Sequence, residues 1–322
     1  MKLGALTVPL YDRSAEDAFY WLHTRGVEAV ELGTGGFPGN THCNPGELLT
    51  SQARLSRFSD LLKKHSLTIS ALSCHSNHLH PNEAVRKQAA DDLTATFKLA
   101  EKLQVRTVVT FSGCPGDHDG AKHPNWVACA WPSYFQEILD YQWNGALIPF
   151  WAETVKEAEA HGVQKIALEM HPGFCVYNPE TLLKLRKAVG PVIGATFDPS
   201  HLFWQGIDPT AAVFSMAEAI YHFHAKDTKI DARNSSVNGR VDTKSLSDIK
   251  NRSWLFRSVG YGNDSSVWKD IFSALQAVGY DGAISIEHED ALMSAEEGLQ
   301  KAICFLREII ISEKPMDNIF WA

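Results

Sequence analysis

Four short apolar runs in the second half of the chain end in side chains that can bind metals or transfer protons. These side chains are Glu169 and His171 in the first run, Asp198 and His201 in the second, His222, His224 and Lys226 in the third, and Glu287 and Glu289 in the fourth. If the runs are neighbouring parallel strands, their carboxyl ends meet at one rim. The pattern then predicts that Glu169, Asp198, His224 and Glu287 converge on one point.

Three crowded carboxylates repel one another and raise one another's pKa values. A divalent cation removes that cost and keeps the carboxylates ionised. A set of oxygens and one imidazole suits manganese, magnesium, cobalt or zinc, and manganese is our first choice. Any one of these residues alone is more simply a helix N-cap or a loop salt bridge. Because four occur in succession, we predict one divalent metal ion held by Glu169, Asp198, His224 and Glu287.

Short apolar runs alternate with amphipathic segments along the chain. The apolar runs are the expected strands and the amphipathic segments are the expected helices that position these residues. Strands are expected over residues 2–9, 29–33, 68–74, 107–112, 165–171, 193–198, 219–226 and 283–287. Helices are expected over residues 15–25, 55–65, 83–103, 150–161, 179–189, 265–278 and 295–311. Eight such units predict a single (β/α)8 TIM-barrel domain over residues 1–322. The alternative is an open doubly wound sheet, but no GxGxxG follows the first strand to support its nucleotide-binding form.

Two long irregular segments interrupt the alternation, over about 113–149 and 228–262. Both follow expected strands, so both belong to the face on which barrel active sites are built. Long loops there are commonly lids or pocket walls, and a dimer contact is the alternative. We expect a homo-oligomer, with a hetero-oligomer left open, and the apolar tail 316–322 is a candidate for docking on a neighbouring subunit or on its own barrel.

The composition excludes several classes of partner. The formal charge is −8 over 322 residues, whereas nucleic-acid-binding proteins usually present a basic face. No apolar stretch approaches the ~18 residues of a membrane span, and the apolar N-terminal run is too short for a signal sequence. The six cysteines contain no CxxC pair, and Cys74 and Cys304 are expected to be buried thiols. We therefore expect a reduced, cytoplasmic protein that binds neither nucleic acid nor membrane.

The four strand ends resemble those of the sugar isomerase/epimerase superfamily of xylose-isomerase-like TIM barrels. The resemblance rests on Glu169, the Asp198-Pro199-Ser200-His201 turn, the segment from His222 to Asp227, and Ile286-Glu287-His288, and it spans nearly the whole chain. It implies a relationship to tagatose 3-epimerase, inosose dehydratase and hydroxypyruvate isomerase. It also implies the same four metal ligands, with His224 rather than His222 as the histidine, and a substrate contact for His201.

The chain departs from the ketose 3-epimerase pattern at two places. It has Cys175 where those enzymes carry a substrate-binding glutamate, and Lys226 and Lys229 where they carry an arginine. The segment 254–262, which contains Arg257, is more similar to C-glycoside deglycosidase subunits and 3-keto-glycoside hydratases or lyases.

We predict a role for each candidate side chain of the site. Glu169, Glu287 and His171 are the predicted acid–base groups, although His171, which precedes Pro172, has loop shaping as its alternative. The predicted substrate contacts are His201, Lys226, His75, His78, Arg257 and Trp126. A salt bridge is the alternative for Lys226, and a second metal is the alternative for the cluster around His75 and His78, as in zinc-dependent endonuclease barrels. Trp126, Trp131 and Trp204 are candidates for stacking on a sugar or an aromatic aglycone, and His222 is expected to be structural.

Four functions are compatible with these residues. The leading hypothesis is a metal-dependent isomerase or epimerase that acts on a sugar or keto-sugar through an enediolate. The second is a lyase or dehydratase that uses the same site to expel a β-substituent. The third is a non-catalytic sugar-binding subunit. The fourth is a DNA-repair nuclease, which the acidic composition disfavours.

Overall fold

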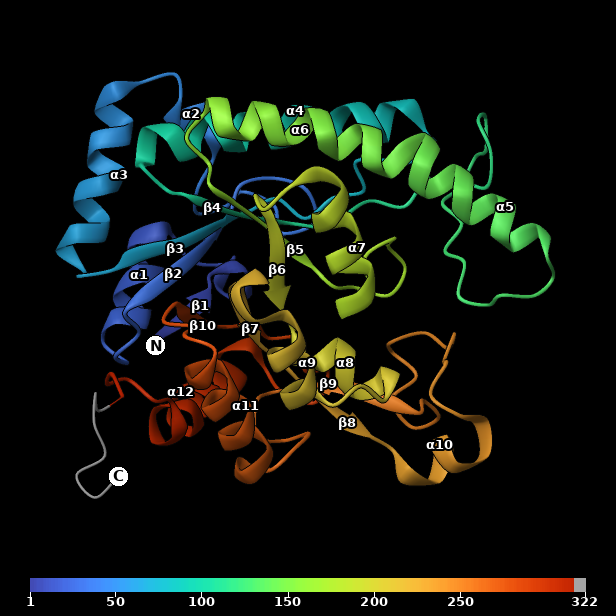
Figure 1. Cartoon of the computed structure of the whole chain (residues 1–322). Helices are drawn as coiled ribbons and strands as arrows, with labels where there is room; N and C mark the ends of the chain where they lie inside the picture. The colour runs from blue at the N-terminus through green and yellow to red at the C-terminus, as the bar shows by residue number, and fades with distance from the viewer. Residues whose placement is uncertain (316–322) are drawn as a thin grey trace.

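Eight parallel strands close into a barrel in the computed structural model, which describes residues 1–315 (Figure 1). The strands are β1 (Lys2–Leu6), β2 (Ala29–Gly33), β3 (Thr68–Ser73), β4 (Thr107–Thr110), β5 (Lys165–Glu169), β6 (Ile193–Phe197), β7 (Ile220–Ala225) and β10 (Ala283–Ile286). They are paired in chain order around the barrel, and β10 closes it against β1. The predicted (β/α)8 barrel is confirmed, and each strand lies within its predicted range.

The strands are buried because helices cover the outside of the barrel (Figure 1). Strands β2, β6 and β10 are buried along their whole length, which explains their nearly continuous apolar sequence. The helices are α1 (Ala15–His23), α2 (Pro45–Leu48), α3 (Gln52–Lys64), α4 (Glu83–Leu103), α5 (Tyr134–Asp140), α6 (Ile148–Ala160), α7 (Pro179–Val189), α8 (Pro199–Gln205), α9 (Pro209–Met216), α10 (Ala232–Asn238), α11 (Ser265–Ala277) and α12 (Ala295–Ile309). Side-chain N-caps begin many of them, for example Ser51 at α3 and Asn82 at α4.

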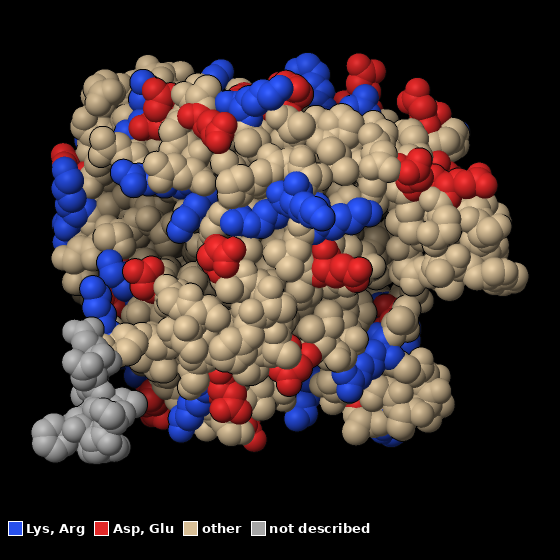
Figure 2. Space-filling model, viewed as in Figure 1, with Lys and Arg blue, Asp and Glu red and all other residues tan. Residues whose placement is uncertain are grey.

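The two insertions lie on the same side of the molecule, at the right of Figure 1. The first contains α5, which continues through the π-helical turn Tyr141–Leu147 into α6. The second contains α10 and strand β9 (Trp254–Arg257), which pairs antiparallel with β8 (Asp227–Ile230) outside the barrel. Figure 2 shows an indentation between these two lobes, and acidic and basic side chains are interspersed on this face.

Some details differ from the sequence prediction. The prediction omitted helices α2, α5, α8, α9 and α10. It also placed Cys304 among the buried thiols, whereas this cysteine is exposed. Cys304 directly follows the buried Ile303 in the amphipathic helix α12, so it lies on the outer face. Cys74 is buried as expected, and all six cysteines are free. Among residues 1–315, no helix is long and apolar enough to cross a membrane. The tail 316–322, predicted to dock, lies outside the described residues.

Candidate metal centre

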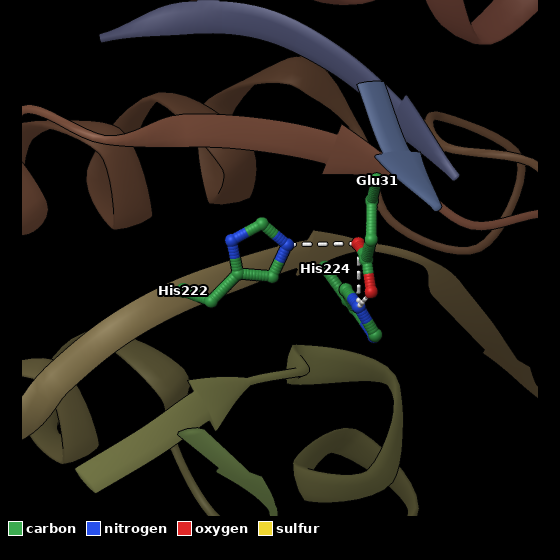
Figure 3. Close-up of side chains that lie close together, drawn as sticks. All are labelled: Glu31, His222 and His224. Atoms are coloured by element: carbon green, nitrogen blue, oxygen red, sulfur yellow. Dashed lines mark hydrogen bonds and ion pairs between the residues drawn. The ribbon is translucent and has the colours of Figure 1, made fainter. Parts of the chain in front are cut away.

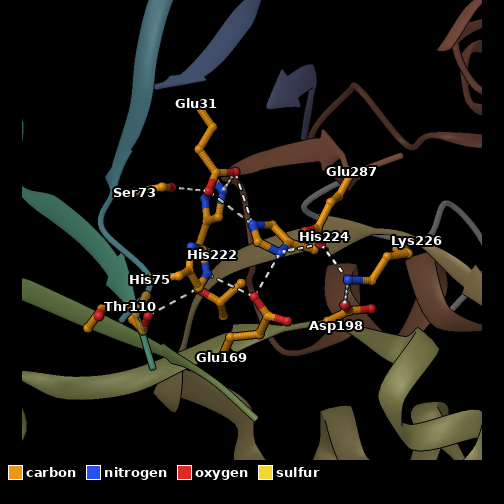
Figure 4. A network of polar contacts seen from close by, with 12 residues as sticks. Glu31, Ser73, His75, Thr110, Glu169, Asp198, His222, His224, Lys226 and Glu287 are labelled. Carbon is orange, nitrogen blue, oxygen red and sulfur yellow. Dashed lines mark hydrogen bonds and ion pairs between the residues drawn. The ribbon is translucent and has the colours of Figure 1, made fainter. Parts of the chain in front are cut away.

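Four strands bring the predicted metal ligands together at the carboxyl-terminal end of the barrel. Glu169 ends β5, Asp198 follows β6, His224 lies in β7 and Glu287 follows β10. One nitrogen or oxygen atom from each side chain lies within 4.8 Å of the corresponding atoms of the other three (Figure 4). Because metal–ligand bonds are about 2.1 Å long, ligands on opposite sides of one ion are about 4.2 Å apart. The geometry therefore fits a single ion after small adjustments.

Three of these side chains present a buried polar atom that makes ion-pair contacts but no hydrogen bond of standard geometry. Asp198 Oδ2, His224 Nδ1 and Glu287 Oε2 are buried and have no hydrogen-bond partner within residues 1–315. Buried polar atoms are almost always hydrogen-bonded, so orphaned atoms that face one another call for a bound group. Three carboxylates and one imidazole nitrogen are the donor set of a divalent cation.

Asp198 has two separate roles, one for each carboxylate oxygen. Its Oδ1 atom accepts a hydrogen bond of 2.8 Å from the backbone N–H of Ser200 and so caps the N-terminus of α8. Its Oδ2 atom remains for the metal centre. The alternatives of N-cap and metal ligand are therefore compatible, because the cap fixes the orientation of the carboxylate.

A buried glutamate that the sequence analysis did not select lies behind His224. Glu31, on β2, is fully buried and accepts hydrogen bonds from His222 Nε2 at 2.8 Å and from His224 Nε2 at 3.0 Å (Figure 3). Ser285 Oγ donates to it at 2.7 Å, and Ser73 Oγ also donates to it. Because Glu31 accepts the Nε2 proton of His224, Nδ1 is the nitrogen that faces the metal centre. Burial lowers the pKa of His224, but Glu31 and Glu287 raise it well above its usual value, so metal binding displaces a proton from Nδ1.

Glu31, His222 and His224 are also spaced closely enough to hold a metal, but hydrogen bonds already satisfy this group. Burial raises the pKa of Glu31, and the two histidines more than compensate and hold it well below its usual value. His222 is thus part of the polar layer inside the barrel, in agreement with its expected structural role. Glu31 orients His224, and His222 and Ser285 orient Glu31.

Lys226 supplies positive charge to the acidic cluster. Its Nζ atom lies 3.1 Å from Asp198 Oδ2 and 2.8 Å from Glu287 Oε2, without hydrogen-bond geometry to either oxygen among the described residues. Burial lowers the pKa of Lys226, but Asp198 and Glu287 raise it well above the usual value. Burial raises the pKa of Glu287, whereas Lys226 and His224 lower it, to about 2. The salt-bridge alternative for Lys226 is therefore present in the structure.

Three further histidines surround Glu169. His201 Nε2 donates a 3.0 Å hydrogen bond to Glu169 Oε1, and His75 Nε2 lies 2.9 Å from Glu169 Oε2. The His171 ring packs against His201, with 4.1 Å between ring centroids. Burial raises the pKa of Glu169, but Lys226 and the histidines lower it well below the usual value. The predicted substrate contacts His75 and His201 and the predicted base His171 thus all lie beside Glu169.

The other predicted substrate contacts are dispersed. Trp126 lines a cavity next to the centre, together with His171 and His201. His78 is fully buried behind the site, where it bonds Thr110 Oγ1 at 2.8 Å and stacks on Phe150. Arg257 is ion-paired with Asp290 at 2.9 Å. The structure therefore does not bring His78 or Arg257 to the metal centre, because each already has a partner elsewhere.

The glycine-rich turn around Gly260 and Gly262 is filled by a side chain of this protein. Backbone N–H groups of Gly260, Gly262 and Asn263 each donate at 3.0 Å to Asp227 Oδ2. A Cβ atom on Gly262 would collide with the Asp227 carboxylate, so the turn requires glycine there. Barrel enzymes that act on sugar phosphates commonly bind phosphate in this region. Here a carboxylate of the protein occupies these donors, so they are not free to bind a phosphate.

Removal of this carboxylate should destabilise the protein. We expect Asp227→Ala to lower the free energy of unfolding by about 3 kcal/mol, because several buried donors lose their acceptor together. Urea unfolding followed by circular dichroism measures the change. Asp270→Ala, at an exposed position on α11, is the control and should change the free energy by less than about 0.5 kcal/mol. An equally small change for Asp227→Ala would contradict the structural role of this carboxylate.

The chain belongs to the xylose isomerase-like TIM barrel family, whose model matches residues 19–309. It is 41% identical over 312 residues to the uncharacterized protein YfiH of Bacillus subtilis (strain 168), covering 96% of this chain and 99% of that protein. A D-tagatose 3-epimerase-like protein of known structure shares 22% identity and a TM-score of 0.62, over 96% of this chain and 98% of that one. The IOLI protein, solved with a bound zinc atom, shares 18% identity and a TM-score of 0.67, over 96% of this chain and 98% of that one. These two solved structures share the fold, and the family predicted from the sequence is confirmed.

Proposed function

We propose that this protein is a divalent-metal-dependent isomerase or epimerase of a non-phosphorylated keto-sugar. The observation that carries the proposal is the convergence of Glu169, Asp198, His224 and Glu287 with three orphaned ligand atoms. The IOLI protein, which shares the fold, was solved with a bound zinc atom, and this supports a metal in the present barrel. We take manganese as the first metal to test, followed by cobalt, magnesium and zinc.

A bound divalent ion supplies Lewis-acid stabilisation of the negative charge that develops on a carbonyl oxygen when the neighbouring carbon loses a proton. Glu169 and Glu287 come from different sides of the barrel rim, so one carboxylate can remove the carbon-bound proton and the other can return it. Lys226 lies 2.8 Å from Glu287 and offsets negative charge in the site. His201, already bonded to Glu169, is placed to contact a substrate hydroxyl.

His171 offers a lone pair to a substrate, but its lowered pKa makes it a weak base. Its Nδ1–H donates to the backbone carbonyl of Pro172 at 2.6 Å, so the Nε2 lone pair is available. Burial lowers the pKa of His171 to about 3, with His201 adding to the shift, so the ring is neutral. The bond to Pro172 fixes the loop and the tautomer, so of the two alternatives for His171, loop shaping is the better supported.

Metal content tests the proposal first. We expect about one divalent ion per wild-type chain after reconstitution, and less than about a tenth of that in Asp198→Ala/His224→Ala, because two of four ligands are lost. Elemental mass spectrometry measures the content. The exposed pair Asp117 and His118, 2.7 Å apart, gives a matched control in Asp117→Ala/His118→Ala, which should keep its metal. A reconstituted wild type without metal would contradict the proposal.

Deuterium exchange then tests the chemistry and separates it from the lyase alternative. A panel of keto-sugars is incubated with the metal-loaded protein in D2O and followed by NMR. We expect deuterium on a carbon next to the carbonyl, with the carbon skeleton intact. Release of water or of an aglycone would replace the isomerase by the lyase or dehydratase. Bound sugar without any exchange would identify a non-catalytic sugar-binding protein.

A further inference from the structure

Two buried cysteines from different loops hydrogen-bond to each other beside the first insertion. Cys114 follows β4 at the start of the insertion 113–149, and Cys175 lies in the loop between β5 and α7. The two residues are 1% and 6% exposed, respectively. The thiol of Cys175 donates to the sulfur of Cys114, and neither cysteine is part of a disulfide. The fold thus places two thiols together that are far apart in the sequence.

Hydrogen bonds of the backbone hold the two segments against each other. The N–H group of Cys175 donates to the carbonyl of Gly113 at 3.0 Å. On the other side, the N–H group of Cys114 donates to Asn77 Oδ1 at 2.8 Å, and Asn77 Nδ2 donates to the carbonyl of Cys114 at 2.9 Å. The proximity of the two thiols therefore follows from a fixed arrangement of the backbone and not only from the rotamers of the two side chains.

The pair differs chemically from the other two buried cysteines. The hydrogen bond from Cys175 lowers the pKa of Cys114, burial opposes this change, and the backbone N–H group of Asn125 adds to the lowering. The same hydrogen bond and burial raise the pKa of Cys175. At Cys43 and Cys74 burial raises the pKa of the thiol. Because the thiolate is the reactive form of cysteine, Cys43 and Cys74 are inert, and the negative charge of the pair resides on Cys114.

A cavity gives small molecules access to the pair. Cys175 lines a cavity of about 380 Å³ between the first insertion and α7, together with residues that include Trp143, Tyr177 and Lys184. The Lys184 ammonium group lies 4.0 Å from the centre of the Trp143 ring, and its charge favours a thiolate at Cys175. A water molecule needs only about 10–15 Å³ of such a cavity. Hydrogen peroxide is larger by a single oxygen atom, so it can reach Cys175.

A metal site is the alternative use of two neighbouring thiols. Within residues 1–315, no group of three or more side chains that could hold a metal ion includes Cys114 or Cys175. Two sulfur atoms alone would supply only two of the four ligands of a structural zinc ion. The pair is therefore suited to oxidation rather than to metal binding.

We propose that Cys114 and Cys175 are a site of reversible oxidation, at which a peroxide converts the two thiols into a disulfide. The proton of the pair moves along the hydrogen bond to Cys114, so the sulfur of Cys175, which lines the cavity, attacks hydrogen peroxide. A sulfur–oxygen bond forms, the oxygen–oxygen bond breaks, and hydroxide takes up the proton of Cys114 and leaves as water.

The thiolate of Cys114 then attacks the sulfenic acid of Cys175. The sulfur–sulfur bond forms, the sulfur–oxygen bond breaks, and the oxygen leaves as hydroxide, which takes a proton from solvent. In total, the two cysteines lose two electrons, and one peroxide is reduced to two water molecules. The lowered pKa of Cys114 favours this second step, because it makes the attacking sulfur a thiolate.

The disulfide would join the first insertion to the loop that holds His171. Cys175 directly follows Phe174, whose ring stacks on Phe111 at 4.3 Å and lies 5.6 Å from the ring of His171. These three rings line a cavity of about 370 Å³ at the candidate metal centre. The oxidation site is thus next to a wall of the candidate site but uses none of its metal ligands, so the inference does not depend on the proposed function.

Peptide mapping of the purified full-length protein tests the proposal. The reduced protein is treated with hydrogen peroxide, unfolded in the presence of N-ethylmaleimide to block free thiols, and digested for mass spectrometry. We expect a linked Cys114–Cys175 peptide that is lighter than the two reduced peptides by two hydrogen atoms and that disappears after treatment with dithiothreitol. The thiols of the pair should be lost at least about tenfold faster than those of Cys43 and Cys74.

Two variants separate the pair from exchange through the exposed thiols. Cys129→Ser/Cys304→Ser removes both exposed cysteines and should form the Cys114–Cys175 link at an unchanged rate. Cys114→Ser removes the attacking thiolate of the second step, so sulfenic acid should accumulate at Cys175, where dimedone traps it. Wild-type protein in which Cys114 and Cys175 stay free while Cys129 and Cys304 are oxidised would overturn the proposal. Oxidation of the pair to sulfinic acids without a link would also overturn it.

Discussion

Glu287→Gln is expected to lower the exchange rate of the reactive keto-sugar by about 10³-fold, within the range of a lost general acid or base. Glu287 Oε2 lies 3.0 Å from His224 Nδ1 and 2.8 Å from Lys226 Nζ, so it is both a ligand atom and a candidate proton acceptor. Glutamine has nearly the same shape but accepts no proton at neutral pH. Deuterium exchange followed by NMR measures the rate, and the metal content of the same sample shows whether the ion is retained.

The metal content of Glu287→Gln distinguishes a role in proton transfer from a role in metal binding. If Glu287→Gln keeps the ion and loses exchange, proton transfer by this carboxylate is supported; if both are lost, metal binding is its main role. Glu153→Gln is the control, because Glu153 is exposed on α6 and paired only with Lys156 among the contacts described for it. Full activity in Glu287→Gln with metal bound would contradict the acid–base assignment.

The barrel is readable from the sequence because its strands are buried. Strand β2 has its predicted bounds, and the other seven strands of the barrel lie within their predicted ranges. Helices α8 and α9 were missed, although Asp198-Pro199 and Asp208-Pro209 are the N-cap and first-turn proline pair that begins helices. The pairing of β8 with β9 could not be predicted, because the two strands are separated by a long insertion.

The site residues that stand at the ends of strands could be predicted from the sequence. Glu169, Asp198, His224 and Glu287 each stand at or near the end of a strand, and a barrel brings such positions together. Glu31 was missed because it is one charged residue inside a short apolar run. That charge is itself a signal, since a glutamate in a strand buried along its whole length requires partners. His78 follows β3 and Arg257 ends β9, but their contacts with Phe150 and Asp290 depend on tertiary packing.

Glu31→Gln is expected to weaken metal binding by about 10- to 100-fold, the usual effect of removing a carboxylate that orients a ligating histidine. The Glu31 carboxylate accepts the Nε2 proton of His224 at 3.0 Å, so Nδ1 is the nitrogen that gives up its proton to bind the metal. The glutamine side chain can turn its own N–H group toward Nε2 of His224. Nε2 then accepts a hydrogen bond, and the ring proton moves to Nδ1, which faces the metal centre. Titration of the metal-stripped protein with manganese or zinc measures the Kd, and urea unfolding of the same preparation measures stability.

Two matched variants make this prediction decisive. Ser285→Ala removes one 2.7 Å hydrogen bond to Glu31 with a small change in volume, so it should weaken metal binding by only about threefold. Glu28→Gln, at an exposed position just before β2, should leave the Kd unchanged. The expected order is therefore Glu31→Gln, then Ser285→Ala, then Glu28→Gln. If Glu31→Gln folds and binds metal as tightly as the wild type, Glu31 has no role in orienting His224, and the polar layer inside the barrel serves stability alone.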